Sequence, residues 1–198
     1  EITALKMFFN SFVMAIGIAT LSVITSLMAA YGLVYFKIKY ATIIFWLIFI
    51  TLLVPLELRI MPSYIVMSKL NLVNTFAGLI LPISASAIAT FFFRQFYKSI
   101  PDELLEAAKL DGTSSWRFFI DFLVPLSKTM IAAVFIFMFV FGYNQYLWPL
   151  IMTTSEQYWT VVMGLKTMYG SISDRFAFVI MSMIPVSYTH LRAHETMV

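Results

Sequence analysis

Cysteine is absent from this sequence of 198 residues, and histidine occurs only twice, as His190 and His194. The missing cysteines exclude disulfide bonds, cysteine-ligated zinc and thiol catalysis. Two histidines near one end leave little for histidine metal chemistry. The pattern G-x-x-x-x-G-K-[ST] is also missing, so the chain cannot hydrolyse ATP through a phosphate loop. Its basic residues form no stripe of the kind that binds nucleic acid.

Charged residues are scarce as well. They make up 12% of the chain, whereas hydrophobic residues make up 61% and the mean hydropathy is +0.90. An ordinary globular domain is about a quarter charged and about half apolar. The composition therefore predicts a membrane protein, and we expect an all-α fold, a polytopic bundle of transmembrane helices.

Four segments are long and apolar enough to cross a bilayer, which takes roughly 20 residues per helix. They cover residues 11–36, 41–61, 75–97 and 122–149, and a fifth apolar run begins near Phe176. Pro55 lies inside the second segment, where it removes a backbone hydrogen bond and is expected to break the helix. The polar stretch after residue 152 is expected to be an external loop, with a short interfacial helix at about 159–168.

Lysine and arginine are concentrated in the loop after the first segment and in the longer loop after the third. Lys37 and Lys39 lie in the first of these, and Arg94, Lys98 and Lys109 lie on or around the second. Because short cytoplasmic loops carry an excess of Lys and Arg, both loops are expected to face the cytoplasm.

The loop after the third segment contains the only charged amphipathic stretch of the chain, at 103–125. Acidic residues follow Pro101, as is favourable at a helix N-terminus, and predict a helix over 102–110. Asp111-Gly112 is expected to end this helix, with the glycine in a left-handed conformation. A second helix is expected over 114–122, leading to Pro125. From the pattern alone, an interfacial helix lying on lipid headgroups and a helix that meets a soluble partner remain equally acceptable.

This stretch resembles a known motif. Glu106-Ala107-Ala108, then Gly112, then Phe122-Leu123-Val124-Pro125 are spaced as in the EAA loop of bacterial ABC importer permeases, E-A-A-x3-G-x9-I-x-L-P. Phe122 and Val124 replace the usual Ile and Leu. The resemblance implies an ABC importer type I permease fold, incomplete at both ends, whose EAA helix docks into a cleft of an ATP-hydrolysing subunit. The residues implied in this coupling are Glu103, Glu106, Ala107, Ala108, Asp111, Gly112 and Pro125.

Further segments are similar to the carbohydrate-uptake permeases of the maltose-transporter type. Within that group, residues 54–64, 84–96 and 142–150 look most like the second permease of importers for sn-glycerol-3-phosphate. The resemblance implies a multi-pass subunit of the bacterial inner membrane that forms half of a translocation pathway. It also implies three partners: a second permease subunit, a dimer of ATP-binding subunits and an extracytoplasmic solute-binding protein. No cofactor is expected on this chain, since ATP and magnesium would bind to the ATPase.

Candidate substrate contacts are ionisable groups and amides placed at membrane depth. Glu57 and Arg59 follow the broken second segment, and Arg59 could bind a phosphate through its planar guanidinium. An equally weighted alternative leaves both at the external interface. Tyr143, Asn144 and Gln145 form a polar island in an apolar helix, where they line the substrate pathway or bond neighbouring helices.

Two other functions are alternatives to a permease for sn-glycerol-3-phosphate. The first is a permease of the same family that imports a neutral sugar or oligosaccharide. The second is an integral-membrane enzyme, which would need acidic or histidine groups converging on one cavity. Nearly all the acidic residues fall in loops or on the charged helix, so an enzyme is disfavoured.

Both ends of the chain are expected to depart from a whole permease. A span is expected to be missing before Asn10, and the run 176–186 is too short to cross a bilayer. Residues 1–186 are therefore interpreted as a partial permease domain, with the coupling loop at about 98–125. Residues 187–198 resemble a translated sequencing adapter, so His190 and His194 are not interpreted as ligands.

Overall fold

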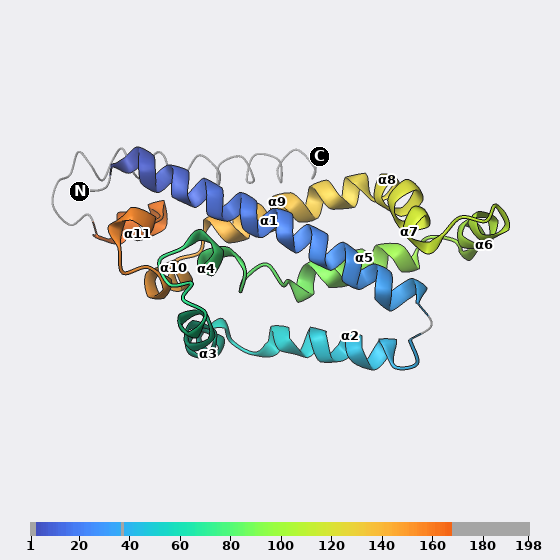
Figure 1. Ribbon diagram of the computed structural model, residues 1–198, viewed down its shortest axis with the longest axis horizontal. Helices are drawn as coiled ribbons and strands as arrows, with labels where there is room; N and C mark the ends of the chain where they lie inside the picture. Colours follow the sequence, from blue (N-terminus) through green and yellow to red (C-terminus); the bar gives the residue numbers. More distant parts are fainter. Residues whose placement is uncertain (1–2, 37, 168–198) are drawn as a thin grey trace, which may run out of the picture. The chain divides into compact units, whose positions relative to one another are not determined.

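The computed structural model of the chain describes residues 3–36 and 38–167, without the side chains of residues 56, 57, 166 and 167. Within these ranges the chain forms helices joined by turns and loops, and no strand (Figure 1). The predicted all-α class is confirmed. The fifth apolar run near Phe176 and the segment 187–198 lie outside the described residues.

The elements follow one another without long connections. In order they are α1 (Ala4–Tyr35), α2 (Ala41–Ile50), η1 (Thr51–Leu53), α3 (Leu56–Lys69), α4 (Phe76–Ile80), α5 (Ala87–Lys98), α6 (Asp102–Leu110), α7 (Ser115–Arg117), the π-helix η2 (Phe118–Leu123), α8 (Val124–Leu126), α9 (Lys128–Tyr143), α10 (Leu147–Met152), η3 (Glu156–Tyr158) and α11 (Val161–Thr167).

The described residues form two compact units. The first contains residues 3–18, 60–82 and 139–167, and the second contains residues 19–36, 38–59 and 83–138. Each unit is therefore assembled from segments that are far apart in the sequence.

Helix α1 confirms the first predicted span. It has 32 residues, which at 1.5 Å per residue give a length of about 48 Å. The second predicted span is broken at Pro55, as expected, with α2 and η1 before the break and α3 after it. Val54 is extended, at φ −79° and ψ 118°, because a residue that precedes proline is driven out of the helical region.

The prediction of one continuous helix over 75–97 is wrong. Residues 81–86 separate α4 from α5, and Pro82 lies in this break. Ser86 has an extended backbone, and its hydroxyl accepts the N–H of Ala89, so a new helix starts there. In the second unit, hydroxyls of α1 supply donors for carbonyls of this break: Thr25 Oγ1 lies 3.2 Å from the Ser84 oxygen and Ser26 Oγ 3.3 Å from the Ser86 oxygen.

The fourth predicted span, 122–149, is wrong at both ends. The uninterrupted helix is α9, and the segment before it bends by 74° between Leu126 and Lys128. Helix α10 is separate. Within the part of the chain that the structure describes, α1 alone is long and apolar enough to span a membrane, and two bent helix pairs raise the number to three.

Three polar side chains organise the loops of the first unit. Asn10 Nδ2 donates to the carbonyls of Gln157 and Trp159, at 2.8 and 3.0 Å, and Ser11 Oγ accepts the N–H of Val161 at 2.9 Å. Asn74 bonds the loop that follows α10. These contacts position α11, which confirms the short helix expected near residue 159; Met168 lies outside the described residues.

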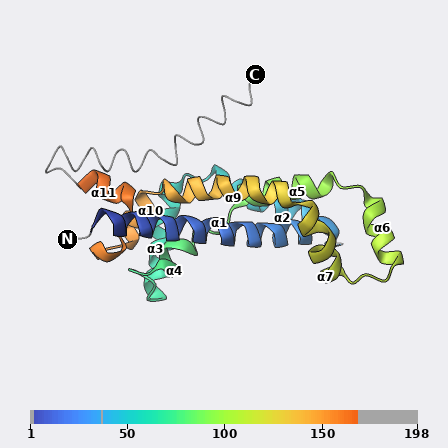
Figure 2. The same cartoon turned by 90° about the horizontal axis from the view of Figure 1, so that it is seen from above.

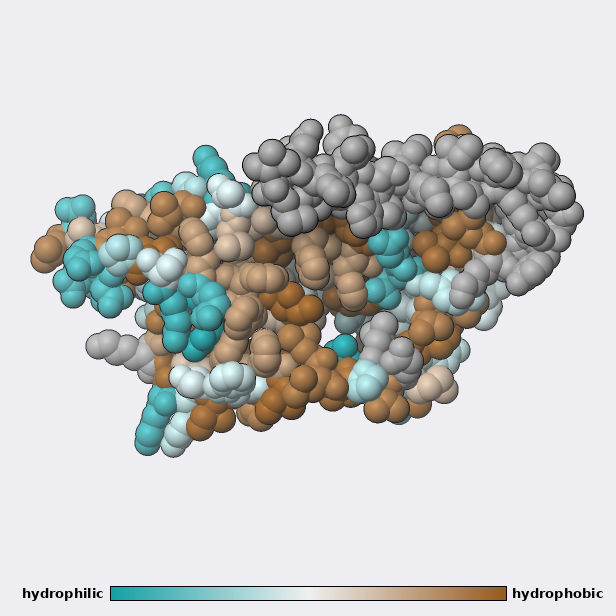
Figure 3. Space-filling model, turned by 180° about the vertical axis from the view of Figure 1, so that it is seen from behind, coloured by the Kyte–Doolittle hydropathy of each residue, from teal (hydrophilic) through white to brown (hydrophobic). Residues whose placement is uncertain are grey.

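Large apolar side chains are exposed on the membrane-span candidates, and brown, hydrophobic surface covers much of the face in Figure 3. On α2 the exposed apolar residues are Ile43, Ile44, Trp46, Leu47 and Ile50. A soluble monomer rarely exposes so much contiguous apolar surface. This surface agrees with the membrane location that composition predicted.

Candidate coupling surface

Helix α6 has the bounds predicted from its sequence. Pro101 occupies the N-cap position in an extended conformation, at φ −60° and ψ 139°. Asp102 and Glu103 lie in the first turn, where they stabilise the positive end of the helix dipole, and Lys109 lies in the last turn at the negative end. Local chemistry alone therefore accounts for this short helix.

The end of α6 is a complete Schellman motif. The N–H of Thr113 bonds the carbonyl of Ala108 at 2.9 Å, and the N–H of Gly112 bonds the carbonyl of Lys109 at 3.0 Å. Gly112 has φ +70°, the left-handed conformation predicted for it. A Cβ built on Gly112 would meet nothing within 4 Å. Glycine is therefore favoured at this position by its left-handed backbone conformation, and not by a neighbour that would clash with a side chain.

One face of α6 is available to a partner. Glu103, Glu106 and Ala107 are exposed, and Leu110 is 89% exposed, whereas Ala108 is buried. Asp111 and Gly112 are exposed as well. Figure 2 shows α6 projecting beyond the ends of α5 and α7, the helices that flank it in the same unit. Acidic and apolar groups thus lie side by side on a helix that stands clear of its neighbours.

The chain returns from α6 through an unusual helix, residues 115–126, which comprises α7, η2 and α8 and which we call the return helix. Ser114 caps α7 by accepting the N–H of Arg117 at 3.4 Å, as the predicted start at residue 114 requires. The prediction of a helix ending at 122 is wrong, because the π-helix η2 and then α8 continue it to Leu126. Pro125 has no N–H to donate and would crowd the carbonyl four residues before it in an α-helix. The π-helix η2, whose turns are wider than those of an α-helix, ends at Leu123, two residues before Pro125.

Aromatic side chains fasten both flanks of α6 to the end of α1. Tyr31 Oη donates to the Ser115 carbonyl at 2.7 Å, and the Tyr31 ring lies 4.9 Å from the Phe119 ring. The centroid of the Tyr35 ring lies 5.5 Å from that of Phe118, which follows α6 in the chain. It lies 5.9 Å from that of Tyr97, which precedes α6.

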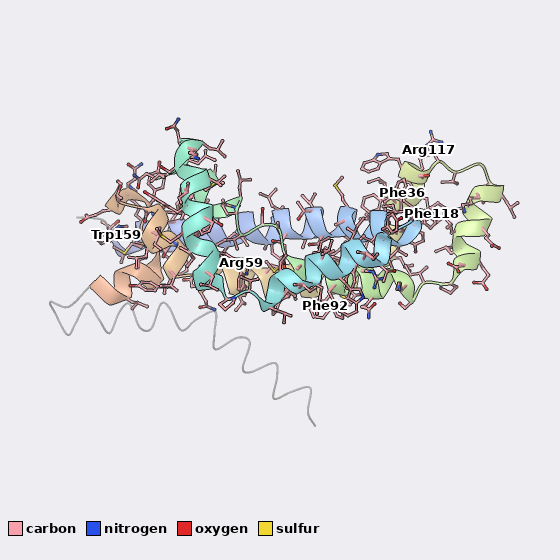
Figure 4. All side chains as sticks on the ribbon, turned by 90° about the horizontal axis from the view of Figure 1, so that it is seen from below. Phe36, Arg59, Phe92, Arg117, Phe118 and Trp159 are labelled. Carbon is pink, nitrogen blue, oxygen red and sulfur yellow. The ribbon has the colours of Figure 1, made fainter. Side chains whose placement is uncertain are left out.

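A small cavity of about 80 Å³ separates this aromatic cluster from α6. Its lining residues are Tyr31, Tyr35, Phe36, Leu105, Ala108, Lys109, Thr113, Ser115 and Phe118. Figure 4 shows Phe36 and Phe118 close together and Arg117 directed away from them. The buried side of α6 therefore faces the end of α1 and the start of the return helix across this cavity.

Tyr143, Asn144 and Gln145 do not lie inside one helix, so their predicted placement within a continuous helix is wrong. Helix α9 ends at Tyr143, and α10 begins at Leu147. Tyr143 is buried between the rings of Phe8 and Phe139, and its hydroxyl has no hydrogen-bond partner among the described residues. Gln145 is also buried, with Nε2 3.4 Å from the Phe141 carbonyl, whereas Asn144 is exposed.

Arg59 lies on α3 and is exposed (Figure 4). Glu57 belongs to the same helix, but its side chain is outside the described part of the chain. Both residues are assigned to the second unit, and Tyr143, Asn144 and Gln145 to the first. No group of three or more His, Cys, Asp or Glu residues that could hold a metal occurs among the described residues.

The aromatic side chains that anchor the loop were not predicted from the sequence. Tyr31 and Tyr35 are four residues apart and so share one face of α1. This spacing could have indicated an aromatic contact face on α1. It could not have predicted the contacting residues, because Ser115 lies 84 positions further along the chain than Tyr31.

Comparison with known proteins gives a family match over residues 22–190, to a model described as a binding-protein-dependent transport system inner membrane component. The chain is 48% identical over 165 residues to the sn-glycerol-3-phosphate transport system permease protein UgpE of Yersinia enterocolitica. It is likewise 48% identical over 163 residues to the protein of that name from Agrobacterium fabrum. These alignments cover 83% and 82% of the chain but 59% and 58% of the relatives. The chain thus spans under two thirds of their length.

A similar fold occurs in a solved structure. The crystal structure of a bacterial ABC transporter involved in the import of the acidic polysaccharide alginate contains a chain that superposes with a TM-score of 0.76. The match covers 96% of this chain and 75% of the other, at 20% sequence identity. At that identity the likeness concerns the fold alone.

Proposed function

The chain belongs to the family of binding-protein-dependent transport system inner membrane components, and on this premise we propose that it acts in a permease subunit of an ABC importer for sn-glycerol-3-phosphate. The subunit would form half of the translocation pathway. The single observation that carries the proposal is α6, an exposed helix with the EAA spacing, fastened at both flanks to a candidate membrane span.

Coupling is proposed to run through the exposed face of α6. An ATP-hydrolysing partner would cover Glu103, Glu106 and Leu110, and its closure would move α6 as a rigid body. The Schellman end at Asp111-Gly112 keeps the helix short and turns the chain back, and Pro125 lies where the return helix meets α9. Energy then reaches this subunit as movement, because the chain carries no phosphate loop.

The proposed partners follow from this role. They are a second permease subunit, a dimer of ATP-binding subunits that carries ATP and magnesium, and an extracytoplasmic solute-binding protein. The exposed apolar side chains of α2 are assigned to lipid or to the second permease.

The substrate proposal is tested with the full-length protein in a complete importer. Uptake of labelled sn-glycerol-3-phosphate is measured in cells that lack other routes for it, with neutral sugars and oligosaccharides as competitors. Uptake that phosphate esters inhibit and neutral sugars do not is the expected result. Saturable uptake of a neutral sugar without uptake of the phosphate would replace the proposal by the neutral-sugar alternative.

Arg59 is proposed to bind the phosphate group during passage, with Glu57, Tyr143, Asn144 and Gln145 as the other pathway residues. Arg59→Gln is expected to lower uptake roughly tenfold, since a charge-assisted hydrogen bond contributes about 1.5–3 kcal/mol. Arg59→Lys keeps the charge and loses the planar fork, so an intermediate uptake is expected. Uptake is measured at equal amounts of assembled complex. Unchanged uptake by Arg59→Gln would make Arg59 an interfacial bystander.

Glu106 is proposed to pair with a basic group of the ATPase. Glu106→Lys is expected to weaken co-purification of the ATPase by roughly fivefold or more, because a close like-charge contact costs several kcal/mol at an interface. Glu156→Lys is the matched control, since it reverses another exposed acid that lies outside α6. Equal recovery of the ATPase with both variants would contradict the assignment.

A further inference from the structure

The end of α1 holds the two flanks of α6 through one pair of tyrosines. Tyr35 contacts Tyr97, which lies one residue before the end of α5, and also Phe118, which starts the π-helix. Tyr31 contacts the return helix through a 2.7 Å hydrogen bond to Ser115 and a ring contact with Phe119. The segment that leads into α6 and the segment that leads out of it therefore share one anchor.

The hydrogen bond of Tyr31 is placed where the helix geometry changes. Its acceptor is the carbonyl of Ser115, the first residue of α7, and the π-helix begins three residues later. The Tyr31 side chain is 7% exposed, and Phe118 and Phe119 are 2% and 5% exposed. The bond itself is partly buried, and a hydrogen bond that is partly shielded from water is stronger than one in bulk water.

We propose that Tyr31 is a positioning residue for energy coupling, and that its hydroxyl fixes the return helix to α1 so that displacement of α6 moves α1. This inference rests on the proposed function. The ring contacts alone permit sliding, because aromatic pairs accept a range of offsets. The hydroxyl-to-carbonyl bond is directional and removes that freedom.

Tyr35 provides a built-in comparison. Its hydroxyl lies 3.5 Å from the Tyr97 carbonyl, at the limit of a hydrogen bond, whereas the Tyr31 bond measures 2.7 Å. Loss of the Tyr35 hydroxyl should therefore matter much less than loss of the Tyr31 hydroxyl, although the two side chains are chemically identical and one turn apart.

The test uses Tyr31→Phe in the full-length importer with its partners, reconstituted in vesicles. Substrate imported per ATP hydrolysed is expected to fall by roughly fivefold, the factor that one hydrogen bond of ordinary strength supplies. Assembly and thermal stability of the complex are expected to stay near those of the unmodified importer, because the ring packing is kept. Tyr35→Phe should lower the ratio less, and Tyr40→Phe, at an exposed tyrosine outside the cluster, should leave it unchanged.

Two results would overturn the inference. Tyr31→Phe with an unchanged transport-to-hydrolysis ratio would show that the hydroxyl does not couple. An equal fall in assembly and in transport, at a constant ratio, would make Tyr31 structural only. Failure of the proposed function itself is distinguishable, because the unmodified importer would then show no substrate-dependent ATP hydrolysis at all.

Discussion

Substitution of Gly112 by valine is expected to reduce coupled transport by at least about fivefold while the subunit still enters the membrane. Gly112 has φ +70°, and a β-branched residue in that region is a conformational outlier costing on the order of 1–3 kcal/mol. The chain would relieve the strain by opening the Schellman bonds of Thr113 and Gly112. The end of α6 would then no longer be fixed. Transport and ATP hydrolysis are measured on the same preparation.

Gly112→Asn is the matched variant for this experiment. Asparagine visits the left-handed region more readily than other side chains, and a Cβ at position 112 meets no neighbour within 4 Å. Asparagine is therefore expected to retain most of the transport. Equal loss with valine and asparagine would locate the requirement in surface shape at position 112 and not in its backbone.

Alanine at position 78 is expected to be the most destabilising single substitution considered for this chain. A Cβ on Gly78 would clash with the carbonyl oxygen of Leu72 and lie 2.7 Å from Met152 Cε. The carbonyl belongs to the backbone and cannot rotate away as a flexible side chain can. Overpacking of this kind costs about 1–3 kcal/mol and occasionally more. The shift would also disturb the 3.3 Å bond from Trp148 Nε1 to the Gly78 carbonyl.

Gly32→Ala is the control, because it makes the same chemical change in α1, where a Cβ would meet nothing within 4 Å. Replacing a glycine inside a helix by alanine stabilises by roughly 0.5–1 kcal/mol. Thermal denaturation of the purified full-length protein should therefore show a marked fall for Gly78→Ala and no fall for Gly32→Ala. Similar curves for the two variants would mean that the approach of Leu72 is not tight in the folded protein.

Helix α6 could be predicted to the residue because its determinants are local. Pro101, the acids after it and Gly112 set both ends within a dozen positions. The break at Pro55 was predictable for the same reason.

The predictions failed where distant groups decide the structure. The gap between α4 and α5 is sustained by hydroxyls of Thr25 and Ser26, which lie 59 and 60 positions from the carbonyls they bond. The mean hydropathy of this stretch predicts one continuous apolar segment, since serine and alanine hardly change that mean. The Ser86 cap was the local sign of a new helix start.

The interruption between α9 and α10 at residues 144–146 was also not predicted from the sequence. Tyr143, Asn144 and Gln145 were recognised as polar, but their polarity was attributed to a substrate or to bonds with neighbouring helices and not to the end of a helix. Buried Gln145 bonds the carbonyl of Phe141, close to where α9 ends. A polar cluster in an apolar run can therefore mark a helix terminus as well as a binding site.

The exposure of α6 makes the loop a natural target for proteases. Lys109 and Arg117 are both exposed, and they bracket the turn that contains Gly112. Trypsin cleaves after such residues when the backbone can enter its active site. If the proposed ATPase covers Leu110 and its acidic neighbours, the same bonds become inaccessible to trypsin. The rate at which trypsin cuts after Lys109 or Arg117 would therefore report, without any label, how much of the subunit in a membrane is joined to the proposed ATPase.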